Sequence, residues 1–181
     1  MARSSIPAEP KPEWVRVTED TRERPGLSWD LSPLRVTRGK LDTFDFSLTG
    51  AEHVGGIERK ELGDFISWIT SERERAERAL MRMLGYQFRA IIVECSWQDI
   101  ERGQWRSKVS VESVIGTVLG WQAMGVPILF PGSREAAQKC AAKMLFIVAR
   151  RQWRLARALL GGCLEAERTA PKLMELERTG G

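Results

Sequence analysis

The chain has 181 residues, of which 43% are hydrophobic and 29% charged, a composition typical of a globular domain that excludes wholesale disorder and a collagen-like repeat. At this length one hydrophobic core can stabilise the fold by packing, so neither disulfides nor a structural metal is required. The net charge of +4 is a mild basic excess, compatible with nucleic-acid binding but not diagnostic of it.

Cysteine and histidine content narrows the possible chemistry. Cys95, Cys140 and Cys163 are far apart and lack metal-ligand spacing, which argues against a disulfide framework or a zinc site and indicates a reduced, cytoplasmic setting, nucleoid-associated if bacterial or viral. His53 is the only histidine, so sites that need two histidines are excluded. Carboxylates and lysine must then carry any catalysis. No apolar run reaches the roughly 20 residues of a membrane span, and no membrane association is expected.

The first third of the chain is predicted to be rich in strands. Residues 1–12 contain three prolines and are expected to form a flexible arm before a domain over 13–160. Period-two alternation and turn residues predict four short strands of a meander, near 14–17, 34–37, 44–48 and 57–60.

The remainder alternates between helical and strand patterns. Helical spacing predicts helices over 61–69, 72–83 and 111–122, the second capped by Ser71 and the third by Ser110. Apolar runs at 90–93 and 127–130 predict covered, parallel strands. A long helix from Ser133 is expected to end at Gly161 and Gly162, leaving a short helical tail over 161–181. The fold class predicted is α/β, with a mixed central sheet flanked by helices.

Three charged residues in the predicted strands can converge on one point. Asp45 lies on one short strand, and Glu58 and Lys60 lie two apart on the next, so that their side chains share a face. Paired carboxylates bind Mg²⁺ through hard oxygens, and a neighbouring lysine can orient the metal-activated water. Phosphodiester hydrolysis needs such a set, although the pattern alone is more often a solvated charged strand.

A longer series of motifs surrounds these residues. Asp20 to Glu23 form an Asp-x-Arg-Glu motif, and Glu58 to Asp64 form Glu-Arg-Lys-x-x-x-Asp, with Asp45 upstream. Arg73 follows near a helix start, and Ile91 to Glu94 form an apolar strand that ends in glutamate. Together these motifs resemble the XPF/Hef nuclease domains, a branch of the PD-(D/E)XK superfamily. The resemblance covers roughly residues 13–154 and implies a single restriction-endonuclease-like domain.

The resemblance also implies a role for each matched residue. Asp45 and Glu58 would be the principal metal ligands and Lys60 the catalytic ammonium. The other matched residues complete the set: Glu23 as a catalytic residue and metal ligand, Asp20 as a further ligand, Arg59 and Arg73 as DNA contacts or braces of the cluster, and Arg22 and Asp64 in support. One departure is Phe44, which stands where the family has glycine before the motif's aspartate.

The function that these features imply is a DNA endonuclease dependent on Mg²⁺ or Mn²⁺, acting on branched or flap-like DNA in repair or recombination. Two alternatives stay open: a catalytically silent DNA-binding or scaffolding subunit, and a nuclease that acts on linear duplex ends or RNA. Residues 144–148 are five consecutive apolar residues, more than one core-facing stripe requires, with Phe146 expected to point outward. Because the family dimerises through C-terminal helices, a homodimer is expected.

Overall fold

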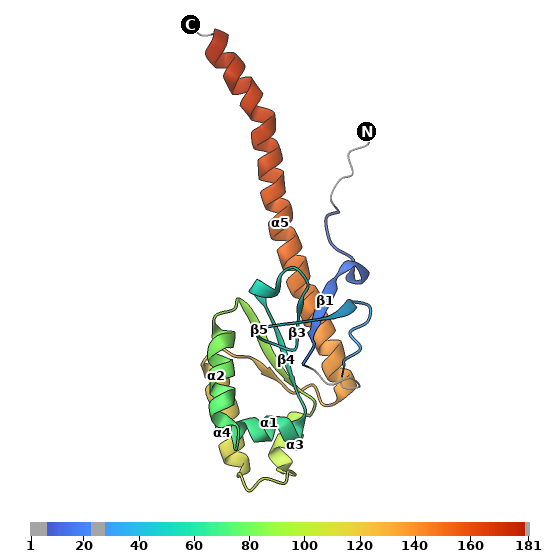
Figure 1. Ribbon diagram of the computed structural model, residues 1–181, viewed down its shortest axis with the longest axis vertical. Coiled ribbons are helices and arrows are strands. Elements are labelled where there is room, and N and C mark those ends of the chain that lie inside the picture. The colour runs from blue at the N-terminus through green and yellow to red at the C-terminus, as the bar shows by residue number, and fades with distance from the viewer. Residues whose placement is uncertain (1–6, 23–27, 180–181) are drawn as a thin grey trace.

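A six-stranded mixed sheet forms the centre of the protein (Figure 1). The computed structural model describes residues 7–22 and 28–179, with side chains up to residue 162. The strands are β1 (Arg16–Asp20), β2 (Arg35–Gly39), β3 (Phe46–Leu48), β4 (Gly55–Lys60), β5 (Phe88–Val93) and β6 (Ile128–Leu129). The helices are α1 (Leu62–Ile69), α2 (Arg73–Leu84), α3 (Trp97–Arg102), α4 (Val111–Ala123) and α5 (Arg134–Thr179), with short 3-10 helices η1 (Pro12–Trp14) and η2 (Glu52–Val54).

The strands lie in the order β2-β1-β3-β4-β5-β6. β3 is antiparallel to both β1 and β4, whereas β4, β5 and β6 pair in parallel. The predicted parallel pairing of the last two strands is therefore confirmed. The prediction of a meander is wrong at β2, which runs parallel to β1 rather than antiparallel. The strands are parallel because the long connection between them returns the chain to the end at which β1 starts.

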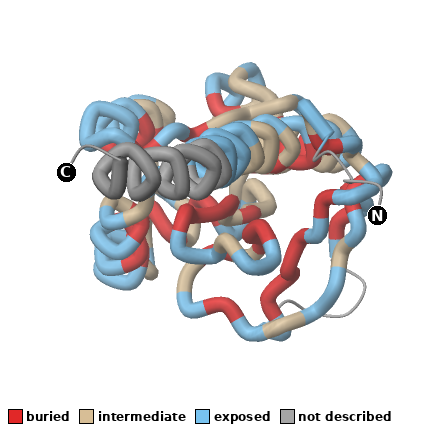
Figure 2. Tube along the Cα trace, turned by 90° about the horizontal axis from the view of Figure 1, so that it is seen from above, coloured by how far each residue is buried: buried red, intermediate tan, exposed pale blue. Residues whose placement is uncertain are grey.

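Helices cover both faces of this sheet. On one face α1, α2, α3 and α4 enclose a core that includes Phe65, Leu80 and Ile91. On the other, α5 packs over Phe46 and Ile92 and places Leu145 against the sheet. Buried positions gather in the central strands, and exposed ones in the outer helices and loops (Figure 2). This arrangement confirms the predicted α/β class with a mixed central sheet flanked by helices.

Helix termini follow the predicted caps only in part. The Ser110 hydroxyl accepts a hydrogen bond from the amide of Ser113 at 3.2 Å and caps α4 as expected. Ser71 does not cap α2, whose N-cap position is occupied by Glu72 with no side-chain cap bond. The short helix α3 was not predicted, although Ser96 and Asp99 form a reciprocal capping box at its start.

Helix α5 is longer than predicted and leaves the domain (Figure 1). It runs through Gly161 and Gly162 to Thr179, so the predicted end at these glycines is wrong. A helical glycine costs only about 1 kcal/mol relative to alanine, which the hydrogen bonds of a continuing helix can offset. Among the described residues, no helix is both long and apolar enough to cross a membrane.

The predicted outward position of Phe146 is also wrong. Its side chain is partly buried against the core, and the Arg150 guanidinium lies 5.9 Å from the centre of its ring. Ile147 is the exposed member of the apolar run, whereas Leu145 is fully buried. Leu145 and Ile147 are two residues apart and therefore point to opposite sides of α5, of which the Leu145 side packs on β3 and β5.

The pairing of β4 with β5 depends on Gly55. Its φ is +132°, and a Cβ there would lie 1.6 Å from the Phe88 carbonyl oxygen. We therefore expect Gly55→Ala to lower the free energy of unfolding by at least about 2 kcal/mol in urea denaturation. Gly63→Ala is the matched control, because a Cβ on this α1 residue meets nothing within 4 Å. Equal stability of the two variants would contradict this assignment.

Candidate functional site

Three carboxylate-bearing segments meet where β1 ends and β3 begins. The Asp20 amide donates to the Asp45 carbonyl at 2.8 Å, and the Asp45 amide donates to the Ile57 carbonyl at 3.0 Å. The Asp45 carboxylate also accepts the backbone N–H of Arg59 at 2.7 Å. Asp45 is thus fixed beside the backbone on both sides of Glu58. The structure brings together the backbones of Asp20, Asp45 and Glu58, which the chain separates widely.

Strand alternation sets the faces of β4. Ile57 points into the core beneath α5, so Glu58 and Lys60 lie toward the opposite face of the sheet. The Lys60 ammonium donates to the Glu58 carboxylate and to the Arg59 carbonyl, the latter at 3.1 Å. It also lies 4.1 Å from the centre of the Trp68 ring on α1. The side chains of Glu58 and Lys60 therefore form a largely enclosed ion pair, and the Trp68 indole covers the ammonium.

Arg59 lies on the face of β4 beneath α5. Its side chain is only 4% exposed, and it donates to Glu94 and to Glu61, each at 2.7 Å. A guanidinium so enclosed cannot reach a phosphate in solvent. The structure thus places the Arg59 guanidinium inside the protein, between Glu94 and Glu61.

Glu94 is the common partner on that face and was not assigned a role from the sequence. Its carboxylate accepts hydrogen bonds from the Trp29 indole at 2.6 Å, from Arg59, and from Arg134 at the start of α5. Its backbone amide donates to the Lys60 carbonyl at 2.9 Å. One carboxylate thus joins the end of β4, the end of β5 and the first turn of α5. The available signal was an acidic residue directly after an apolar strand.

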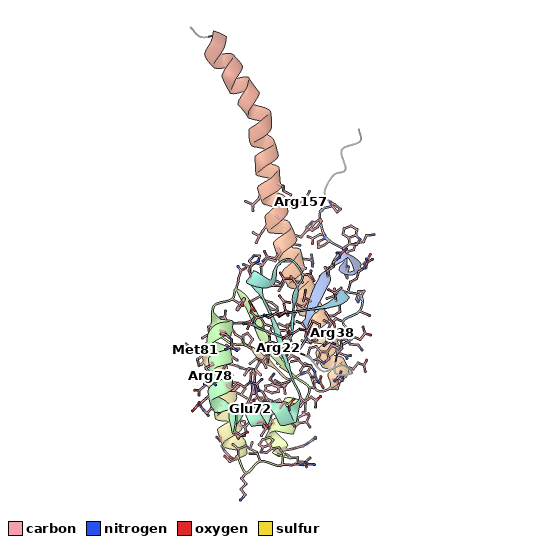
Figure 3. The ribbon with its side chains drawn as sticks, viewed as in Figure 1. Arg22, Arg38, Glu72, Arg78, Met81 and Arg157 are labelled. Carbon is pink, nitrogen blue, oxygen red and sulfur yellow. The ribbon has the colours of Figure 1, made fainter. Side chains whose placement is uncertain are left out.

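The remaining residues of the first motif differ in their surroundings. The Asp20 side chain is almost fully buried. Its carboxylate accepts hydrogen bonds from the Arg22 guanidinium and, at 3.3 Å, from the Leu41 amide. Arg22 itself is exposed near the middle of the domain (Figure 3). Glu23 lies outside the described residues. The Asp20 carboxylate is therefore held by Arg22 and by the Leu41 amide of the loop before β3.

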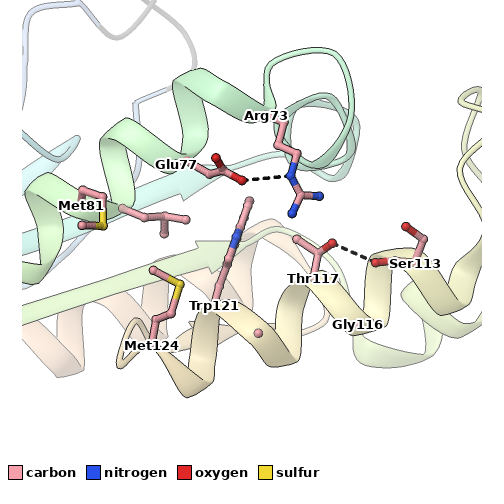
Figure 4. A pocket seen from close by; sticks show the side chains of 10 residues that line it. Arg73, Glu77, Met81, Ser113, Gly116, Thr117, Trp121 and Met124 are labelled. Atoms are coloured by element: carbon pink, nitrogen blue, oxygen red, sulfur yellow. Dashed lines mark hydrogen bonds and ion pairs between the residues drawn. The ribbon is translucent and has the colours of Figure 1, made fainter.

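The other two matched residues lie on helices. Asp64 is exposed in the first turn of α1, where the positive end of the helix dipole stabilises a carboxylate. Arg73 pairs with Glu77 at 3.0 Å and lines a groove of about 540 Å³ between α2 and α4, together with Thr117 and Trp121 (Figure 4). The lining of this groove contains neither Asp45 nor Glu58. Arg73 is thus engaged away from the acidic group.

Phe44 takes the backbone conformation that favours glycine. Its φ is +75°, in the left-handed region that costs a bulky residue about 1–3 kcal/mol. The ring is buried and packs edge-to-face on Tyr86, with 5.0 Å between ring centres. A Cβ on Gly56 would lie 2.9 Å from the Phe44 Cβ, so Gly56 leaves the space that this conformation needs. Burial of Phe44 offsets the strain directly before Asp45.

Cys95 follows Glu94 and is excluded as a nucleophile. The thiol is buried, and this burial, aided by the charge of Asp99, raises its pKa to about 12. Since the thiolate is the reactive form, the neutral thiol behaves as a small apolar side chain.

The donor chemistry of the site fits a hard divalent cation in part. Asp45 and Glu58 supply carboxylate oxygens, which Mg²⁺ and Mn²⁺ prefer. Within residues 7–22 and 28–162, no group of three or more acidic, cysteine or histidine side chains could hold a metal ion. Of the ligands that the resemblance implies, Asp45, Glu58 and Asp20 lie in the described part of the chain, and Glu23 lies outside it.

The fold is similar to that of XPF from Aeropyrum pernix. The two structures superimpose with a TM-score of 0.59 at 20% sequence identity, and the match covers 75% of this chain and 62% of the XPF chain. The likeness to the XPF fold that the motifs predicted is therefore confirmed. No family model matches the sequence, and no curated protein does.

The role of Glu94 can be measured as stability. Glu94→Gln removes the charge that faces the buried guanidinium of Arg59, and we expect it to lower the free energy of unfolding by about 2–3 kcal/mol. Glu77→Gln is the matched control, because its exposed pair with Arg73 contributes less than about 0.5 kcal/mol. Urea denaturation of the two variants measures the difference, and a Glu94→Gln protein as stable as the control would contradict the bracing role.

Proposed function

We propose that the protein is a DNA endonuclease dependent on Mg²⁺ or Mn²⁺ that hydrolyses phosphodiester bonds in branched or flap-like DNA, as in repair or recombination. The observation that carries this proposal is the meeting of Asp45 and Glu58, with Lys60 beside them, in a fold similar to XPF. The proposed setting is intracellular, since Cys95 and Cys140 are free thiols.

In this proposal each residue of the site has a separate task. Asp45 and Glu58 hold the cation, with Asp20 and Glu23 completing the acidic group. The bound cation supplies charge neutralisation at the phosphate and a more acidic water. Lys60 exchanges its bond with Glu58 for one with the attacking water or a phosphate oxygen, so its ammonium is held ready at the site. Arg59 keeps β4 in place through Glu94.

A second candidate is a DNA-binding subunit without catalysis. It is favoured by the engagement of Asp20 with Arg22 and Leu41 and of Glu58 with Lys60, which leaves fewer free carboxylate oxygens for a cation. Such a subunit would bind DNA and leave it uncut in the presence of Mn²⁺. The other alternative is a nuclease of the same chemistry with another substrate. It is tested by comparing cleavage of linear duplexes and RNA with cleavage of flap and fork substrates.

Catalysis is tested by neutralising the ligands one at a time. Asp45→Asn and Glu58→Gln are expected to abolish cleavage of a labelled flap with Mg²⁺ or Mn²⁺ while DNA binding persists, because each change removes metal affinity and no basic group. Lys60→Met is expected to lower turnover at least tenfold. Asp42→Asn, at an exposed position of the loop before β3, is the matched control and should cleave normally. Wild-type cleavage by the Asp45 or Glu58 variant would refute the assignment.

The uncovered end of α5 supports a homodimer. Ala141 and Leu145 face the sheet. Leu155 and Leu159, ten and fourteen residues after Leu145, continue the same side of the helix. Leu155 and Leu159 are 50% and 73% exposed, because α5 has left the domain there. We propose that a second copy of the chain covers this apolar continuation.

Light scattering tests the assembly. The wild-type protein is expected to have about twice the 20.5 kDa mass of one chain, and Leu159→Glu to have the mass of one chain with unchanged circular dichroism. Ala158→Glu, which adds the same charge to another side of α5, is the matched control and should remain a dimer. A wild-type monomer at high concentration would rule out the dimer.

A further inference from the structure

The first two-thirds of α5 carries a marked excess of positive charge. Residues 134–162 include seven lysines and arginines and a single acidic residue, Glu135, although the whole chain has a net charge of only +4. The described remainder of the protein therefore carries no comparable excess, and α5 is the electropositive element of the fold. A concentration of this kind indicates a polyanionic ligand.

Four of these basic residues lie on one side of the helix. At 100° per residue, Lys143, Arg150, Arg154 and Arg157 fall within about 60° of one another, opposite Ala141 and the apolar continuation proposed as a dimer contact. We name them the α5 basic stripe. It is about 21 Å long at 1.5 Å per residue, and Arg157 lies on the part of α5 beyond the domain (Figure 3).

Two arginines of the stripe already hold an anion. Arg150 Nε donates to one oxygen of the Glu9 carboxylate at 2.8 Å, and Arg154 Nε donates to the other at 2.7 Å. The Trp153 indole donates to the Pro7 carbonyl at 2.9 Å and fixes the N-terminal segment alongside. Hydrogen bonds from Arg150 and Arg154 hold the pKa of Glu9 below its usual range, so the carboxylate stays charged. The pair of guanidinium groups is thus arranged as a clamp for an oxyanion.

The anion in this clamp is replaceable. Arg150, Arg154 and Glu9 are all at least 39% exposed, and ion pairs in such positions contribute little net stability because water and salt screen them. Glu9 neutralises only one charge of the stripe, and Lys143 and Arg157 have no carboxylate partner among the described residues. A chain of phosphates can contact all four residues, which one carboxylate cannot.

We propose that the α5 basic stripe is a second nucleic-acid contact surface, which binds the phosphodiester backbone away from the acidic site and which Glu9 occupies as a competing anion in the free protein. Phosphodiester is the chemistry that fits, because it presents repeated oxyanions along the length of the stripe and arginine forks match phosphate oxygens. The identity of the ligand rests on the proposed function, whereas the clamp itself does not.

Fluorescence anisotropy with a labelled DNA fork, in EDTA so that no cleavage occurs, tests the surface. Arg154→Gln is expected to weaken binding about fivefold or more and to reduce the slope of log affinity against log salt by about one. Glu9→Gln is expected to tighten binding about twofold or more, because it removes the competitor. Arg78→Gln on α2 removes the same charge from an exposed ion pair and serves as the matched control, with less than about a twofold effect.

The double variant separates competition from a general charge effect. If Glu9 acts by occupying the clamp, the gain from Glu9→Gln disappears in the Arg154→Gln background, whereas a general charge effect gives the same gain in both backgrounds. Equal behaviour of Arg154→Gln and Arg78→Gln would overturn the proposal. So would unchanged DNA affinity together with a halved mass of Arg154→Gln in light scattering, which would make the stripe a contact between copies. Failure of the wild-type protein to cut DNA with Mg²⁺ bears on the proposed function alone, since the binding assay contains no metal.

Discussion

The buried ion pair between Arg59 and Glu94 is the interaction on which the arrangement of the site depends. A guanidinium and a carboxylate enclosed beneath α5 are expensive to desolvate, and they are tolerated because each has further hydrogen-bond partners. The pair holds the end of β4 against the end of β5. Because side chains alternate along a strand, whatever fixes Arg59 also fixes Glu58 and Lys60 on the opposite face. The candidate site on one face of the sheet is thus supported from the other face.

Alternation is also why part of the site could be predicted from the sequence. Two charged residues spaced by two in a short strand must share a face, and the meeting of Asp45 with Glu58 needed only one antiparallel pairing, between β3 and β4. The burial of Arg59 could not be predicted in this way, since a charged residue in a strand is ordinarily taken as solvated. Its partner, Glu94, lies 35 residues away in the chain, and only the parallel pairing of β4 with β5 brings the two together.

The remaining differences from expectation arise where local signals compete with tertiary packing. The direction of β2 is set by the long connection from β1, which carries no periodicity to indicate where the chain turns back. Gly161 and Gly162 are a strong local signal for a helix end, yet the cooperativity of a helix already anchored on the sheet through Ala141 and Leu145 outweighs it. The central strands and most helices were predictable because their apolar periodicity and their burial agree.

The left-handed backbone of Phe44 has a consequence for how such proteins are found. The residue before Asp45 adopts a positive φ, a conformation that costs glycine less free energy than any other residue. Phe44 adopts it here because its ring is buried in the core against Tyr86, and this burial offsets the strain. A sequence search pattern that requires glycine directly before this aspartate finds chains with glycine there and misses chains with a buried aromatic residue such as Phe44. A pattern that accepts phenylalanine at position 44 together with glycine at position 56 on the neighbouring strand would also retrieve sequences that build this backbone around a buried ring.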